Sequence, residues 1–164
     1  MNRDPRHSLR LIVSGGQTGA DRAALDAALA AGFPCGGWCP EGRQAEDGVI
    51  PDRYPLEELP GAGPRQRTIR NVVDADGTAI LYRGTPEGGT ELTLAHAIKK
   101  RRPYLLIDSL EISPERAGER LAAFVVEAGI GRLNVAGPRA SKDPGVYDFV
   151  HEAVTGMLEI LGRS

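Results

Sequence analysis

The chain has 164 residues, which suffice for one domain with a buried central sheet but not for two independent cores, so we expect residues 1–164 to form a single domain. A formal net charge of −2 gives no overall positive potential for binding nucleic acid or an acidic membrane surface. The opening residues MNRDPRHSLR hold no signal-peptide apolar region, and no apolar run reaches the roughly 18 residues of a membrane span, so we expect a cytoplasmic protein.

The chain begins with a predicted strand, turn and helix. The apolar strand covers residues 10–14, the glycine-rich turn 15–19 and the helix 21–31, which Gly32 ends. Residues 33–64 carry 6 of the 12 prolines and predict an irregular segment with at most a short strand at 36–39. A long irregular segment in a compact domain is usually functional or an oligomer contact.

The second half of the chain alternates helices and strands. The predicted elements are a helix at 66–74, a strand at 78–82, a helix at 91–101, a strand at 104–108, a helix from Ser113 and Pro114 to 128, a strand at 132–136 and a helix at 146–161. Right-handed crossovers between such strands give a Rossmann-like α/β fold, a three-layer sandwich with a mostly parallel central sheet.

Cys35 and Cys39 are the only cysteines, and no histidines lie near them in the sequence. They cannot complete a four-ligand zinc site, so we expect reduced, partly buried thiols and no metal site.

The first candidate binding loop is SGGQTGADR, where a strand enters a glycine-rich turn that opens a helix. Glycines let backbone N–H groups approach an anion, and the helix N-terminus attracts it. The predicted ligand-binding residues of this loop are Gly15, Gly16, Gln17, Thr18, Gly19 and Arg22. Asp21 either contacts the ligand or caps the helix, and a glycine-rich turn without any ligand is the structural alternative.

Two later loops also follow strands. The second offers Gly88, Gly89 and Thr90 at a helix start, where Thr90 either caps the helix or binds a phosphate oxygen. The third offers Arg139 and Ser141, with Lys142 beside them; its cations either balance ligand charge or are ordinary surface charges. Because carboxyl ends of parallel strands share one sheet edge, we expect the loops to converge there, and Gly16→Asp or Gly89→Asp to weaken phosphate binding.

Four polar residues near the second loop have two interpretations each. Thr68 and Asn71, three apart, share a helix face and either point into the cleft or tie loops together. Asp74 and Asp76 form either a carboxylate pair or, as the following glycine favours, a turn with side-chain to backbone hydrogen bonds. The loops contain no convincing set of acid, base and nucleophile, so no catalytic residue is predicted.

Five segments of the sequence resemble one protein family. They are GGQTGADRAALDAAL, GFPCGGWCPEGRQAEDGVIPDRYPL, RTIRNVVDADGTAIL, GGTELT and LNVAGPRASKDPGVY, and they resemble the molybdenum carrier family, a branch of the Rossmann-like SLOG superfamily that also contains the LOG phosphoribohydrolases. The resemblance covers residues 11–147. It implies that the chain binds molybdenum cofactor, a phosphorylated pterin, or a nucleotide on residues 15–19 and 88–90, and that it forms a dimer or tetramer in which the segment around Trp38 takes part.

The LOG enzymes carry Gly-Gly-x-Gly-Thr-x-x-Glu, whose glutamate helps to cleave an N-glycosidic bond. Here the residue three beyond Thr90 is Thr93, which has no carboxylate. The sequence therefore favours a binding or carrier protein over an enzyme. A LOG-type phosphoribohydrolase that uses Glu87 or Glu91, and a nucleotide sensor, are the alternatives.

Overall fold

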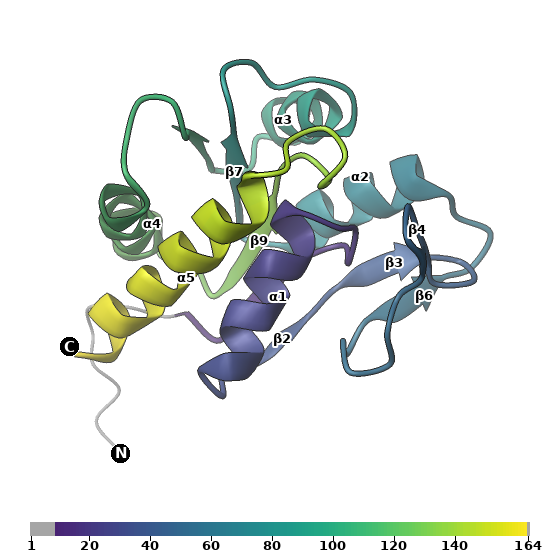
Figure 1. Ribbon diagram of the computed structural model, residues 1–164, viewed down its shortest axis with the longest axis horizontal. Coiled ribbons are helices and arrows are strands. Elements are labelled where there is room, and N and C mark those ends of the chain that lie inside the picture. Colours follow the sequence, from purple (N-terminus) through teal and green to yellow (C-terminus); the bar gives the residue numbers. More distant parts are fainter. Residues whose placement is uncertain (1–8, 164) are drawn as a thin grey trace.

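A five-stranded parallel sheet forms the centre of the computed structural model, which describes residues 9–163 (Figure 1). The strands are β1 (Leu11–Val13), β2 (Cys35–Gly36), β7 (Gly77–Tyr82), β8 (Tyr104–Asp108) and β9 (Arg132–Ala136). Their order is β2-β1-β9-β7-β8, and every neighbouring pair is parallel. The predicted α/β fold with a mostly parallel sheet is thus confirmed. The opening segment, for which no signal peptide is predicted, lies outside the described residues.

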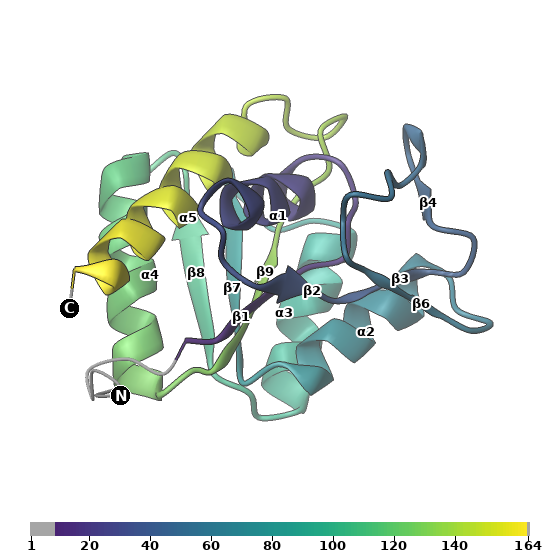
Figure 2. The same ribbon diagram turned by 90° about the horizontal axis from the view of Figure 1, so that it is seen from below.

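Helices cover both faces of the sheet (Figure 2). The helices α1 (Ala20–Ala30), α4 (Pro114–Ala128) and α5 (Val146–Gly162) lie on one face, and α2 (Pro64–Asp74) and α3 (Gly89–Lys99) lie on the other. None of the helices within residues 9–163 is long and apolar enough to cross a membrane.

The main core lies between the sheet and the first of these helical layers. Its α1 contribution is almost entirely alanine, so the helix approaches its neighbours closely. At the crossing of α4 and α5, a β-carbon on Gly118 would lie 3.0 Å from the carbonyl oxygen of Ala153. Small residues therefore set the spacing of this layer.

The predicted elements exist, with ends that move by one or two residues. The largest shifts are of two residues: α2 begins at Pro64 rather than residue 66, and α3 begins at Gly89 rather than residue 91, so Gly88 becomes the N-cap of α3. The predicted strand at 36–39 is wrong as one element, because Gly37 (φ 134°) turns the chain sharply against the backbone of Ser14. Gly36 belongs to β2, whereas residues 38–40 form β3 (Trp38–Pro40) in a separate sheet.

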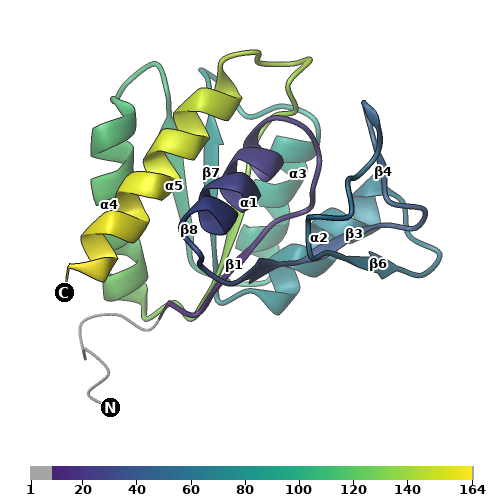
Figure 3. The same cartoon turned by 60° about the horizontal axis from the view of Figure 1, so that its bottom comes forward.

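The proline-rich segment is ordered although it is irregular. Strand β3 pairs with β6 (Glu57–Leu59), and β4 (Gln44–Ala45) pairs with β5 (Gly48–Val49) in a hairpin that stands to one side of α1 and α2 (Figure 3). A small second core beneath it contains Leu25, Cys39, Ile50, Tyr54 and Leu56. Both cysteines are free, Cys39 buried and Cys35 half-buried, as predicted.

Trp38 is anchored within the chain by α2. Asn71 accepts a hydrogen bond from the Trp38 amide (2.8 Å) and donates one to the Trp38 carbonyl (2.9 Å), so it ties segments together rather than pointing into a cleft. Asp74 accepts from the Trp38 indole at 2.8 Å, while Asp76 accepts from backbone amides at the start of β9. The two aspartates are therefore not a pair, and assembly into a dimer or tetramer stays a prediction.

Candidate ligand-binding site

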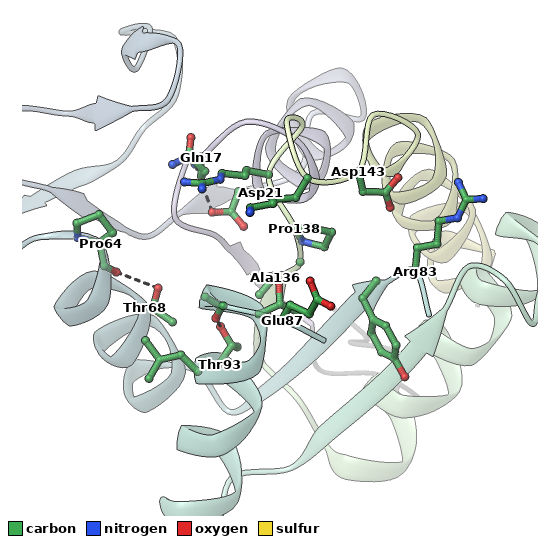
Figure 4. Close-up of a pocket in the computed structure, with 18 of the residues that line it drawn as sticks. Gln17, Asp21, Pro64, Thr68, Arg83, Glu87, Thr93, Ala136, Pro138 and Asp143 are labelled. Atoms are coloured by element: carbon green, nitrogen blue, oxygen red, sulfur yellow. Dashed lines mark hydrogen bonds between the residues drawn. The ribbon is translucent and has the colours of Figure 1, made fainter. Parts of the chain in front are cut away.

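A pocket of about 1020 Å³ opens at the carboxyl ends of β7 and β9 (Figure 4). These strands are neighbours in the sheet, yet β7 continues into α3 on one face and β9 continues into α5 on the other. Ligands of open α/β sheets bind at such a point of divergence. The pocket wall comes from the loops after β1, β7 and β9 and from the first turns of α2.

The N-terminus of α3 is open to this pocket. Gly88 adopts φ 54°, and a β-carbon at Gly88 or Gly89 would meet no heavy atom within 4 Å. Within residues 9–163, the amides of these two glycines donate to no protein group. Helix N-termini carry a partial positive charge, so the two free donors make this a candidate position for an anion.

The pocket has a positive local charge although the whole chain is negative. Five cationic side chains line it against three carboxylates, which gives a local net charge of +2. The cations are Arg65, Arg67, Arg83, Arg139 and Lys142, and the carboxylates are Asp21, Glu87 and Asp143. In Figure 4, Asp21 and Gln17 lie on one side of the space, Glu87 lies near its middle, and Arg83 lies across from them.

The glycines of the first loop face protein groups instead of open space. The Arg67 guanidinium lies against Gly15 where a β-carbon would stand. Gly16 (φ 79°) packs on Leu56, and Gly19 (φ 82°) packs on the backbone of the loop after β9. This loop therefore has little room for a ligand phosphate.

The buried carboxylate of Asp21 occupies the anion position of that first loop. Its Oδ2 accepts a hydrogen bond from the Gln17 amide (3.3 Å) and forms a salt bridge with Arg67 Nη1 (3.2 Å). Burial raises the pKa of Asp21, and the Arg67 charge opposes that rise. The Asp21 side chain therefore does not cap α1; its hydrogen bond is with the Gln17 amide in the preceding turn.

A second acidic group fastens the hairpin to the first and third loops. The Glu46 carboxylate accepts from the Thr18 hydroxyl, from the Ser141 amide (3.1 Å) and from the Ser141 hydroxyl (2.6 Å). Arg139 Nε lies 3.5 Å from it. Hydrogen bonds from Ser141 and Thr18 lower the pKa of Glu46.

Arg22 is held in a similar way by the next residue of the hairpin. Its guanidinium pairs with both oxygens of the Asp47 carboxylate and donates to the Gly16 carbonyl at 3.1 Å. Only 11% of the Arg22 side chain is exposed, and it does not line the pocket. The sequence predicts that Arg22 binds a ligand, but in the structure its guanidinium is paired with the Asp47 carboxylate.

Residues 12–158 match the family described as "Circularly permutated YpsA SLOG family". The chain belongs to this family. Among solved structures, this SLOG chain is similar to the crystal structure of "Putative molybdenum carrier protein" from Syntrophus aciditrophicus SB. The two are 44% identical with a TM-score of 0.90, over 93% of this chain and 96% of the other. Curated proteins yielded no match.

The permutation can be followed in the sheet of this SLOG chain. Moving β9 and α5 ahead of β1 renumbers the strand order as 3-2-1-4-5, which is the Rossmann order 3-2-1-4-5-6 without its sixth strand. Leu9 and Leu161, near the two ends of the described chain, both belong to the main core cluster. In the renumbered sheet, the pocket lies between strands 1 and 4, where the order reverses.

Some of the ligand-binding residues predicted from the sequence line the pocket of this SLOG chain, and others do not. Those that line it are Gln17, Gly88, Gly89, Thr90 and Arg139. Those outside its lining are Gly15, Gly16, Thr18, Gly19, Arg22 and Ser141. Ligand binding by any of them stays a prediction.

Three cations of the pocket were not singled out from the sequence. Arg83 directly follows β7 at the switch point, and Arg65 and Arg67 lie in the first turns of α2, which begins earlier than predicted. A rule that inspects the residue after each parallel strand would have found Arg83. Nothing local distinguishes Arg65 or Arg67 from the many other arginines.

The second candidate loop of this SLOG chain, which follows β7, places one carboxylate in the pocket lining. Glu87 lines it, whereas Glu91 is exposed and does not. Thr93 is buried, and its hydroxyl donates to the Gly89 carbonyl at 2.9 Å. If this loop contributes a proton donor or acceptor, Glu87 is the residue placed to do so. In the described part of the chain, no three His, Cys, Asp or Glu side chains gather to hold a metal ion.

Proposed function

We propose that the protein is a binding or carrier protein that holds a phosphorylated small molecule in this pocket. The observation that supports it is the α3 N-terminus, where the Gly88 and Gly89 amides have no protein partner and five cations surround the same space. A phosphate there receives main-chain and charge-assisted hydrogen bonds. The pocket volume accommodates the rest of a nucleotide-sized or pterin-sized molecule.

We propose molybdenum cofactor as the first ligand to test, because the 44% identical protein is named a molybdenum carrier. The donor set fits the phosphate of that cofactor, with Gly88, Gly89 and Arg83 as the residues that would hold it. Gln17 and Thr68 offer hydrogen bonds to the pterin ring. The cofactor, when bound, supplies a metal held by its own dithiolene sulfurs; the pocket lining has no cysteine or histidine to coordinate it.

A titration with variants tests this function. Isothermal titration with molybdenum cofactor and with common nucleotides should give saturable binding that Arg83→Gln weakens about 10- to 100-fold, as expected for one charge-assisted hydrogen bond. Arg116→Gln is the matched control, because Arg116 pairs with Glu119 on the solvent-exposed face of α4. If the chain binds no phosphorylated molecule, or if both variants bind equally, the proposal fails.

Glu87 favours a second candidate, a LOG-type phosphoribohydrolase. In that reaction water adds to the anomeric carbon of a nucleoside monophosphate as the N-glycosidic bond breaks, with a carboxylate moving the proton. Incubation with purine and pyrimidine monophosphates should then release free base, and Glu87→Gln should stop the release. If the nucleotides stay intact after long incubation, the hydrolase candidate is rejected and the carrier function is the remaining proposal.

A further inference from the structure

The hairpin of β4 and β5 fills a ready-made anion site with its own side chain. We propose that Thr18, Arg139 and Ser141 form a phosphate-binding subsite beside the main pocket, which Glu46 occupies until a phosphate group of a ligand replaces it. This subsite is separate from the anion position at the α3 N-terminus. It rests on the proposed function in one respect, which is that its natural ligand enters through the same pocket.

Donors from two distant loops converge on the Glu46 carboxylate. The loop after β9 supplies the Ser141 amide (3.1 Å), the Ser141 hydroxyl (2.6 Å) and Arg139 Nε (3.5 Å). The loop after β1 supplies the Thr18 hydroxyl. Since Thr18 Oγ1 already accepts from the Ala140 amide at 3.1 Å, its proton is directed toward the carboxylate. An amide, two hydroxyls and a guanidinium are the donor types that bind phosphate in proteins.

The subsite is connected to the main pocket through shared residues. Arg139 lines the pocket and also faces Glu46. Gln17 lines the pocket, and its side-chain oxygen accepts from the Glu46 amide at 2.9 Å. A ligand that takes up Gln17 or Arg139 therefore removes a contact that holds the hairpin in place.

The hairpin is suited to being displaced. Each of its strands has only two residues, and the β4–β5 pairing forms a sheet of its own. A two-stranded hairpin of this kind is marginal without tertiary contacts. Its tip is held by the contacts of Gln17, Glu46 and Asp47 described above, and of these side chains only Glu46 occupies the donors of the subsite. An external anion that competes for these donors can therefore displace the Glu46 carboxylate.

Asp47 provides a matched control for the charge of Glu46. It is the next residue on the same hairpin, and Asp47→Asn removes the same single charge as Glu46→Gln. Its partner Arg22 lies outside the pocket lining. A general change in protein charge, or a general loosening of the hairpin, affects both variants, whereas only Glu46→Gln removes the carboxylate that occupies the subsite donors.

Inorganic phosphate is the probe, and Gly89→Asp is the background, since it blocks the main anion position. If Glu46 leaves the subsite free in fewer than about one molecule in ten, Glu46→Gln should bind phosphate at least about tenfold more tightly than the background in a phosphorus NMR titration. Asp47→Asn should gain less than Glu46→Gln, because Glu46 still occupies the subsite donors. An equal gain in both variants, or no gain in Glu46→Gln, overturns the subsite.

Amide hydrogen exchange of the unmodified protein tests the same proposal, and this test does not depend on whether a variant folds. Saturating phosphate should speed amide exchange in residues 44–49, because the hairpin loses the Glu46 contacts; unchanged or slower exchange contradicts the proposal. Failure of these experiments leaves nucleotide or cofactor binding at Gly88 and Gly89 untouched. Conversely, loss of that main function does not alter the phosphate response of the Glu46→Gln variant.

Discussion

Gly89→Asp separates the binding role of the α3 N-terminus from its role in folding. A β-carbon at Gly89 meets no atom within 4 Å, and its backbone is not in the left-handed region, so the side chain fits. Aspartate in the first turn of a helix is favourable by about 0.3–1 kcal/mol, and replacing a helical glycine removes a further entropic cost. We therefore expect the variant to fold and to be at least as stable as the parent.

The same aspartate should repel a bound phosphate strongly. At roughly 5 Å and an effective dielectric constant of about 20, two unit charges repel by about 3 kcal/mol, which corresponds to roughly a 100-fold loss of affinity. Rotation of the side chain toward solvent reduces this value, and the second charge of a phosphate increases it. A loss of about 100-fold is thus the expected result.

Isothermal titration with the same phosphorylated ligand measures that loss, and Gly89→Asn is the control. Asparagine has the size of aspartate without its charge, so its affinity should fall by less than about fivefold. Equal losses in the two variants would indicate a steric effect instead of an anion site. Unchanged affinity in folded Gly89→Asp would show that the phosphate does not lie at the α3 N-terminus.

Three further predictions concern stability and are measured by urea denaturation. Gly16→Ala should lose about 2–5 kcal/mol, because its left-handed backbone and its overlap with Leu56 leave no place for a β-carbon; a neutral result would refute this packing. Asp21→Asn should lose about 3–5 kcal/mol by leaving Arg67 buried without a counterion, and adding Arg67→Met should restore much of it. The pKa of Glu46 is lower in the folded chain, so its stabilisation is complete above about pH 4.5 and disappears at lower pH; Glu46→Gln should lack this pH dependence, and equal slopes would contradict it.

Local sequence signals predict most of the fold because glycines and prolines mark where elements end. Ser113 and Pro114 start α4 as expected, with the Ser113 hydroxyl accepting from the Arg116 amide. The sheet edge that carries the ligand loops also follows from strand direction alone. The strands β4, β5 and β6 were missed and β3 was predicted only in part, since strands of two or three residues are set by tertiary contacts and carry no periodicity.

The residues that line the candidate pocket follow only in part from the sequence, because a glycine loop shows where donors lie but not which groups they already contact. The partners of the first loop come from far along the chain: Glu46 is 28 residues from Thr18 and 95 from Ser141. Arg67 reaches Gly15 from a helix on the opposite face of the sheet. Such contacts depend on the completed fold, so spacing within the loop cannot reveal them.

The closed first loop and the open second loop contribute to the pocket in different ways. Asp21 holds Arg67 at the pocket wall through Nη1, and this is the one hydrogen bond of the Arg67 side chain that the described residues provide. An arginine that is already ordered loses less conformational freedom when it binds an anion than a free surface arginine does, a difference of up to about 2 kcal/mol. The packed first glycine loop therefore orders a pocket cation through Asp21, whereas the second loop leaves its own amides open to the pocket.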